Sequence, residues 1–366
     1  MVLVPRMNER IERAARILRD AVDGRTFPAA VAEVGHSGGV LWQEAFGRLT
    51  FDDQSPSAEL DTIFDLASLT KPIATTSTVL HFVNQGRLGL DESPSRYCPE
   101  WTGVERGPVT IRHLLDHSSG LSARLHGRRP DTRRAFEHDI CTMPLECPPG
   151  SRVIYSDLGF ILIGFCIERV GEASLASLAG SVLDTVAHAS SSQGAHAGLL
   201  ISVPQHLKDR TAPTTPLPED PRRGHRLIGE VHDDYAAALG GSAGHAGLFG
   251  SGPGVGVFAR TVLRAALGIG SVDPFTRDSV AAMVTRSAVA GSSRALGWDT
   301  MLPTSSCGMH MTPAAFGHVG FTGTSLWIDP GADRYYVLLT NRVCDGGTSE
   351  GMQRVRRAFH NALTAA

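Results

Sequence analysis

Hydrophobic and polar positions follow two different periods along the chain. In the first 22 residues, apolar side chains such as Ile11, Leu18 and Val22 recur at the spacing that is typical of an amphipathic helix. Residues 28–34 and 39–47 alternate between apolar and polar instead. The polar, glycine-rich stretch between these two segments predicts a turn, so we expect a β-hairpin there.

Helical spacing returns in the middle of the chain. Residues 68–85 predict a helix that Gly86 ends. Residues 110–121 predict a short helix and a turn, and residues 150–170 predict a turn followed by an apolar helix. Residues 186–230 are rich in Pro, Gly, Ser and His, which favours loops.

The C-terminal part is β-rich again. Residues 294–300, 317–330 and 334–341 carry strand-like patterns, and residues 351–365 predict a final amphipathic helix. Strands at both ends with helices between them fit one sheet that both termini build, rather than alternating βαβ units.

We therefore expect two interlocked domains, which a chain of 366 residues is long enough to form. Residues 1–60 and 290–366 would make a discontinuous α/β sheet domain. Residues 61–289 would make a mostly helical domain.

Composition excludes several classes of function. The net charge is −3, so the chain lacks the excess of basic residues that is typical of a nucleic-acid-binding protein. The sequence contains no run of 18 apolar residues, so we expect no membrane span. The N-terminal residues lack the apolar core and cleavage site of an export signal, so we expect a cytoplasmic protein. The six cysteines form no C-x-x-C pair, which favours reduced thiols and no structural metal site.

Lysine is rare in this chain. Of 34 basic residues, all but Lys71 and Lys208 are arginine. A guanidinium keeps its proton at any ordinary pH, whereas surroundings can lower the pKa of a lysine until it acts as a base. A lysine close to a nucleophile is therefore worth examining.

Ser37 lies in Gly-His-Ser-Gly-Gly, residues 35–39, which matches the G-x-S-x-G nucleophile elbow. An elbow needs a helix after the serine, but residues 40–46 have the pattern of a strand. The context therefore favours a hairpin turn. We expect Ser37 at the rim of the sheet, away from the reactive site.

Ser68 is the stronger candidate nucleophile. In Ser-Leu-Thr-Lys, Ser68 and Lys71 are three residues apart at the start of a predicted helix, so both side chains share one face. A neutral amine beside a hydroxyl can accept its proton, and the backbone N–H groups of a helix start can stabilise an oxyanion.

Two later segments carry further candidates. Tyr-Ser-Asp, with Tyr155 and Asp157, opens the apolar helix after a Pro-Pro-Gly turn. His-Val-Gly, from His318 to Gly320, lies in the C-terminal strand region, where glycine lets a backbone approach a substrate.

In this order and context, the three motifs resemble those of the penicillin-recognising serine hydrolases. The branch that this sequence resembles contains class C β-lactamases, D,D-carboxypeptidases and β-lactamase-like esterases. The similarity covers essentially the whole chain. It implies the α/β (α+β) β-lactamase/transpeptidase-like fold, in which an antiparallel sheet from both termini is flanked by helices and interrupted by a mostly helical insertion. The active site would lie between the two domains.

The resemblance also implies roles at the matched positions. Ser68 would be the acylated nucleophile, Lys71 its proton acceptor and Tyr155 a general base and acid. The backbone N–H groups of Ser68 and Phe321 would form the oxyanion hole. The substrate site would include Asp157, His318, Gly320 and Phe321.

This chain departs from the family pattern at three positions. Asp157 replaces an asparagine, His318 replaces a lysine, and Val319 replaces a threonine. An acid and a mostly neutral histidine weaken recognition of an anion. We therefore expect esterase or peptidase-like chemistry on a less charged substrate.

Two other histidine patterns occur in the chain. Gly-His-Ala-Gly around His245 mimics the third motif, but a helical pattern follows it, so His245 is expected at most to border the cleft. His113 and His117 have zinc-site spacing, but Leu114 stands where such a site needs glutamate. That segment is expected to be a helix with two polar histidines.

The sequence therefore predicts a serine hydrolase that acts through an acyl-enzyme on a small ester, amide or lactam, with no cofactor and no metal. Two alternatives stay open. One is an acyltransferase that uses the same acyl-enzyme, and the other is a catalytically silent binding or sensor protein. The sequence leaves the oligomeric state open.

Overall fold

A computed structural model describes residues 3–127, 129–190, 198–222 and 224–365. Its centre is a six-stranded sheet in the order β2-β1-β9-β8-β7-β6, with every neighbouring pair antiparallel. The strands are β1 (Ala29–His36), β2 (Gly39–Gly47), β6 (Asp299–Thr300), β7 (Phe316–Val319), β8 (Ser325–Asp329) and β9 (Arg334–Thr340). The first two come from the N-terminal part of the chain and the other four from the C-terminal part, so the predicted antiparallel sheet is confirmed.

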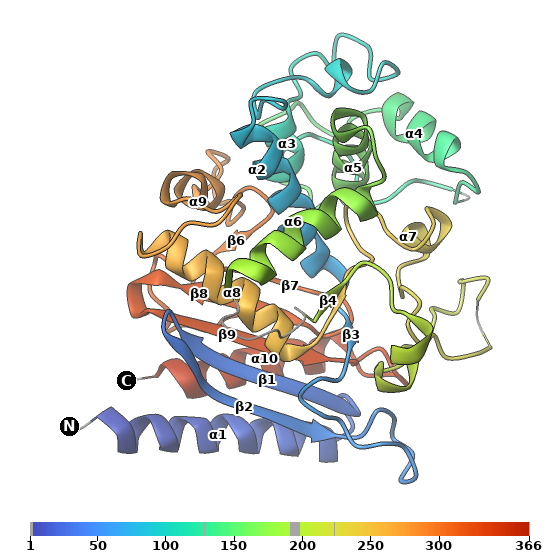
Figure 1. The fold of residues 1–366 in the computed structure, drawn as a ribbon. Coiled ribbons are helices and arrows are strands. Elements are labelled where there is room, and N and C mark those ends of the chain that lie inside the picture. The colour runs from blue at the N-terminus through green and yellow to red at the C-terminus, as the bar shows by residue number, and fades with distance from the viewer. Residues whose placement is uncertain (1–2, 128, 191–197, 223, 366) are drawn as a thin grey trace.

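Helices cover both faces of this sheet (Figure 1). The first helix, α1 (Leu3–Asp23), and the last, α10 (Ser349–Thr364), pack together on one face, while α8 (Gly252–Ala266) lies on the other. Strand β1 is buried on both sides because Ala30 faces the α1/α10 core and Val31 faces the α8 core. Burial on both faces explains why its sequence alternates only weakly.

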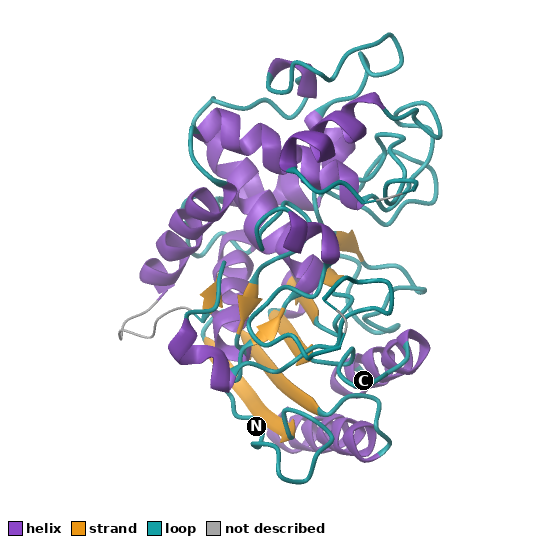
Figure 2. Cartoon of the chain, turned by 90° about the vertical axis from the view of Figure 1, so that its right-hand side faces the viewer, coloured by secondary structure: helices purple, strands orange, loops and turns teal. Residues whose placement is uncertain are grey.

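The remaining helices gather at one end of the molecule, as Figure 2 shows. They are α2 (Ser77–Asn84), α3 (Ile111–Leu115), α4 (Arg133–Thr142), α5 (Asp157–Gly171), α6 (Leu175–Ser190), α7 (Asp234–Ala238) and α9 (Arg277–Val284). A small sheet of β3 (Phe64–Asp65), β5 (Phe249–Gly250) and β4 (Leu199–Leu200) lies near the junction with the large sheet. The sequence did not predict α4, α6, α7 or α9.

The predicted helix at 68–85 is not uniform. A 3₁₀ turn at Ala67–Leu69 leads into a stretch of π-helix at Lys71–Thr76, and α2 follows. Pro72 brings no N–H group to this ladder, and wide helical turns are frequent at functional sites. Gly86 has a φ of 68°, which confirms it as the residue that ends the helix.

The hairpin around Ser37 is confirmed. Strands β1 and β2 pair up to His36 and Gly39, and Ser37 lies in the turn between them. Asp333 holds it there, since its carboxylate accepts hydrogen bonds from Ser37 N at 3.0 Å and Ser37 Oγ at 3.1 Å.

The predicted loop region 186–230 contains two short elements, β4 and a 3₁₀ helix at Gln205–Arg210, and α6 extends into it as far as Ser190. Residues 191–197 and 223 of that region lie outside the described residues. Among the helices that the structure describes, none combines the length and the apolar character that a membrane crossing requires.

Candidate active site

Ser68 stands at a strained turn between β3 and the helical segment. Ala67 has a φ of 48°, and its N–H group donates to Asp65 Oδ1 at 2.8 Å. Thr70 Oγ1 donates back to the Ala67 carbonyl oxygen at 2.6 Å and accepts from Leu248 N at 3.0 Å. These contacts fix the turn and leave Ser68 half-buried.

Lys71 lies directly beside this serine. Its fully buried ammonium nitrogen is 3.0 Å from Ser68 Oγ, 2.8 Å from Asp157 Oδ1 and 3.3 Å from the His245 carbonyl oxygen. Burial alone would lower the pKa of Lys71, but the charge of Asp157 and the phenol of Tyr155 outweigh it. The pKa of Lys71 is therefore raised, and the resting side chain is an ammonium ion.

Tyr155 leads into α5 and lies among cationic and aromatic groups. Its ring centroid is 4.7 Å from Lys71 Nζ, 4.9 Å from the Arg294 guanidinium carbon and 4.5 Å from the ring centroid of His117. His117 Nδ1 accepts a hydrogen bond from Ser156 N at 3.0 Å. The side chain and backbone around Tyr155 are thus fixed from two sides.

His117 corrects one prediction. It was expected to be a polar histidine on a helix, but it lies just beyond α3 and is 1% exposed. Burial, followed by the charges of Arg294 and Lys71, lowers the pKa of His117 well below its usual value. It is therefore a neutral residue packed under Tyr155 rather than a solvated one.

The third motif faces Ser68 from the large sheet. His318 lies on β7, and its Nδ1 is 2.9 Å from the Val319 carbonyl oxygen. Burial, and then the charges of Arg294 and Lys71, lower the pKa of His318 well below its usual value, so the ring is neutral. A Cβ atom on Gly320 would lie 2.1 Å from Thr324 Oγ1 and 2.6 Å from the Leu66 carbonyl oxygen, so this position requires glycine.

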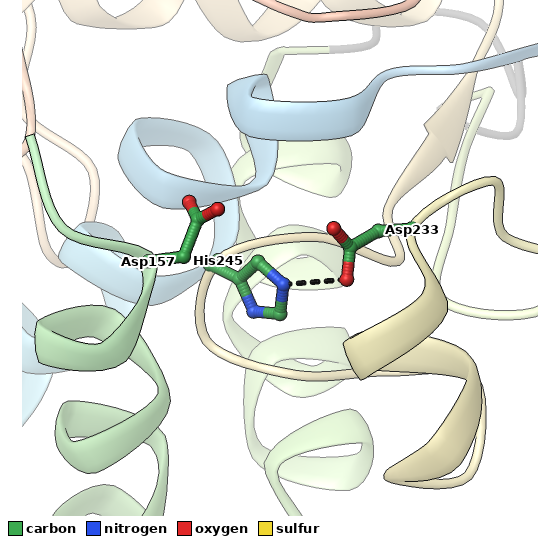
Figure 3. Close-up of side chains that lie close together, drawn as sticks. All are labelled: Asp157, Asp233 and His245. Atoms are coloured by element: carbon green, nitrogen blue, oxygen red, sulfur yellow. Dashed lines mark hydrogen bonds and ion pairs between the residues drawn. The ribbon is translucent and has the colours of Figure 1, made fainter. Parts of the chain in front are cut away.

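Figure 3 shows a second cluster, made of Asp157, Asp233 and His245. His245 Nε2 is 2.7 Å from Asp233 Oδ1, and Arg124 Nη1 lies 3.2 Å from Asp233 Oδ2 and 3.6 Å from Asp157 Oδ2. Burial would raise the pKa of Asp233, but the neighbouring His245 and Arg124 hold it far below its usual value.

The donor atoms of this cluster all lie within 4.8 Å of one another, close enough to hold a metal ion. However, Lys71 binds one carboxylate and Arg124 binds both. A divalent cation would have to displace Arg124 and would then face the ammonium of Lys71. The donor set therefore suits an ion-pair network better than a metal site.

Two cavities meet at Ser68, and both are also lined by Tyr155 and Phe321. The larger, of about 860 Å³, extends over Arg124, Asp157, His245 and the loop around Leu217. The smaller, of about 300 Å³, is lined by His318 and by three arginines: Arg294, Arg342 and Arg356.

The structure therefore brings together every residue that the sequence predicted for the site, and it places Ser37 elsewhere. His245 lines the larger cavity, as expected for a residue at its border. The residues predicted from the sequence did not include Arg124, Asp233 or the three arginines of the smaller cavity. Arginine is so common in this chain that no pattern marked these positions. Asp233 had a local signal, since it caps α7 by accepting from Ala236 N.

Comparison with known proteins now adds to this geometry. The family model described as Beta-lactamase matches residues 14–358. The chain belongs to the beta-lactamase family.

Two curated relatives are similar to most of this chain. A protein of Escherichia coli (strain K12), described as a candidate D-alanyl-D-alanine carboxypeptidase, is 29% identical, with 91% of this chain and 82% of that protein covered. An N-acetylmuramyl-L-alanine amidase of Bacillus subtilis (strain 168) is 28% identical, with coverages of 89% and 79%.

Among solved structures, EstCE1 has the same fold, with a TM-score of 0.77, 20% identity and coverage of 98% of this chain and 99% of that one. It is described as a hydrolase with promiscuous acyltransferase activity. The β-lactamase/transpeptidase-like fold that the sequence predicted is thereby confirmed. It is the fold of a family of serine hydrolases.

Proposed function

We propose that this beta-lactamase-family protein is a serine hydrolase that cleaves an ester or amide through an acyl-enzyme on Ser68. The observation that carries the proposal is the 3.0 Å contact between Ser68 Oγ and Lys71 Nζ at the meeting point of two cavities. A nucleophile needs a base within hydrogen-bond reach and room for substrate on both sides of the bond that breaks.

The reaction would run in two steps. Ser68 Oγ attacks the carbonyl carbon while its proton passes to the amine form of Lys71, and the N–H groups of Ser68 and Phe321 stabilise the oxyanion. The bond to the leaving group breaks as Tyr155 relays a proton to it. Water then attacks the acyl carbon, and Ser68 regains its proton. Tyr155 suits the relay because it borders both cavities and its ring centroid is 4.7 Å from Lys71 Nζ.

The smaller cavity favours a substrate with an anionic group near the scissile bond. Arg356 is 7% exposed, donates to the carbonyl oxygens of Gly320 and Thr324, and leaves its Nε without a partner among the described residues. Arg342 likewise donates to carbonyl oxygens, those of Phe321 and Gly347. Buried guanidinium groups that bind no carboxylate attract an anion strongly.

This revises the expectation of a less charged substrate, which rested on Asp157 and His318 alone. One relative is named as a candidate D-alanyl-D-alanine carboxypeptidase, and that name refers to an amide bond beside a terminal carboxylate. The other is named as an N-acetylmuramyl-L-alanine amidase, and that name refers to an amide bond. We propose a small carboxylate-bearing amide or ester as the substrate class.

An activity-based experiment tests the proposal. The protein is incubated with a fluorophosphonate probe and, separately, with a p-nitrophenyl ester. We expect label on the Ser68 peptide and ester turnover, both abolished in Ser68→Ala. Ser37→Ala is the matched control, because Ser37 carries the G-x-S-x-G motif but lies in the hairpin turn, bound to Asp333, and it should keep both. Label on the Ser37 peptide, or no label with no turnover, would reject the proposal, and the latter would favour the binding or sensor alternative.

Acyl transfer is the second candidate, supported by the likeness to EstCE1. Its acceptor would be an alcohol or amine in place of water. Adding a primary alcohol to the ester assay distinguishes the two reactions, because a transferase forms the new ester at the expense of the free acid.

A further inference from the structure

Lys71 poses a problem for the proposed reaction, because the residue that should accept a proton already carries one. The Lys71 side chain is fully buried, and its ammonium nitrogen lies 2.8 Å from Oδ1 of the Asp157 carboxylate. Before Ser68 can lose its proton, Lys71 must become an amine. What surrounds this ion pair therefore decides when the nucleophile is active.

Asp157 is itself shared between two cations. Its Oδ1 binds Lys71, and its Oδ2 lies 3.6 Å from Arg124 Nη1. Arg124 is held independently of Asp157, because it also pairs with Asp233 at 3.2 Å and with Asp234. Its guanidinium carbon stacks 3.8 Å from the ring centroid of Tyr235.

We propose that Asp157 and Arg124 are positioning residues that set the charge of Lys71: Asp157 holds it as an ammonium ion, and Arg124 counteracts Asp157 from the far side of the carboxylate. The inference rests on the proposed function, in which Lys71 takes the proton of Ser68. Asp157 then controls the charge of Lys71 in addition to lining the pocket. Arg124, which no sequence motif indicated, controls it as well.

Other groups around Lys71 act alongside this pair. The Ser68 hydroxyl and the His245 carbonyl oxygen both accept from its ammonium, and the Tyr155 ring lies beneath it. The remaining charged or titratable groups packed around this centre are His117, after α3; Arg294, before β6; His318, on β7; and the Asp233–His245 pair, beside α7. His117 and His318 are neutral. Among the described residues, Asp157 is the carboxylate in contact with Lys71, and Arg124 is a cation that shares it.

The charge of Lys71 can be measured directly, because Lys208 is the only other lysine in the chain. Protein grown with ¹³C-labelled lysine should give two side-chain Cε resonances whose shifts follow protonation. Lys208 serves as an internal control in the same sample. The measurement needs no substrate, so it reports on the proposal even if the protein has no hydrolase activity.

In Asp157→Asn, we expect the titration midpoint of Lys71 to move down by roughly one to three pH units, the effect of losing an adjacent opposite charge. Arg124 keeps its contacts with Asp233 and Asp234 in that variant. Arg124→Gln in the otherwise wild-type protein should instead raise the midpoint, because the cation that shares the Asp157 carboxylate is lost. Arg129→Gln is the matched control. Arg129 lines the same cavity and donates to the Asp234 carbonyl oxygen at 3.0 Å, so removing it should leave the midpoint in place.

An unchanged or higher midpoint in Asp157→Asn would overturn the part given to Asp157. Equal midpoints for the variants that carry Arg124→Gln and Arg129→Gln would overturn the part given to Arg124. Circular dichroism confirms folding at each pH. The rate of Ser68 labelling against pH is then compared with the midpoint of Lys71. If the midpoints shift as expected but the labelling rate does not follow them, the proposal about charge stands and Lys71 is not the proton acceptor.

Discussion

Glu33 offers a sharp test of how burial controls this fold. It lies in the centre of β1 and is 1% exposed, with Oε1 accepting from the Tyr335 hydroxyl at 2.8 Å and Oε2 without a partner among the described residues. Burial raises the pKa of Glu33 to about 7, against the opposing effects of the Tyr335 hydrogen bond and the Arg260 charge.

The sign follows from proton binding in the two states. Between pH 4.5 and about 7 the folded protein holds the Glu33 proton more tightly than the unfolded chain does, so the free energy of unfolding falls as pH rises through this window. A difference of about 2.5 pKa units corresponds to about 3 kcal/mol. Glu33→Gln removes the titration and keeps an acceptor for Tyr335.

The assay is urea unfolding of both proteins at pH 5, 6, 7 and 8. Relative to wild type, Glu33→Gln should gain about 2.5 kcal/mol between pH 5 and pH 8, with the gain nearly complete above pH 7. Glu44→Gln on the neighbouring strand β2 is the control, because its side chain is partly exposed and pairs with an exposed Arg19. A stability difference between wild type and Glu33→Gln that stays constant from pH 5 to pH 8 would refute the reasoning.

Three further predictions concern the site itself. Gly320→Ala should cost about 1–3 kcal/mol of stability by overpacking and should slow Ser68 labelling, which thermal unfolding and probe kinetics measure. Arg356→Met should lower kcat/KM for carboxylate-bearing esters by roughly 10- to 100-fold, the worth of one charged hydrogen bond, while a neutral ester of the same size is hydrolysed as before. His117→Phe keeps the aromatic contact with Tyr155 but leaves Ser156 N without its acceptor, so it should destabilise the protein by about 1–3 kcal/mol in urea unfolding.

Local patterns were enough to predict the sheet and the core of the site. The hairpin at Ser37 followed from two strand-like segments on either side of a glycine-rich turn, and the pairing of Ser68 with Lys71 followed from their spacing. Both depend on contacts within a few residues. The motif G-x-S-x-G matches at Ser37 by residue type alone, because the strand that follows excludes an elbow.

Long-range electrostatics could not be predicted in the same way. Arg124 reaches Asp157 and Asp233 across 33 and 109 residues of sequence, and nothing in the local pattern around Arg124 marks it. The resting charge of Lys71 depends on a distant residue in the same way. The spacing from Ser68 identified Lys71 as a candidate proton acceptor, but its ion pair with Asp157, 86 residues away, favours an ammonium ion in the resting protein.

The measurement that tests the central claim most directly is the mass of the protein during turnover. An activated ester with a carboxylate in its leaving group is mixed with the enzyme and quenched in acid within milliseconds to seconds, and the intact protein and its peptides are weighed. The account predicts an increase equal to one acyl group, located on the Ser68 peptide, and no increase in Ser68→Ala. Turnover that continues without any acylated peptide, or an acyl group found on Ser37, would contradict it.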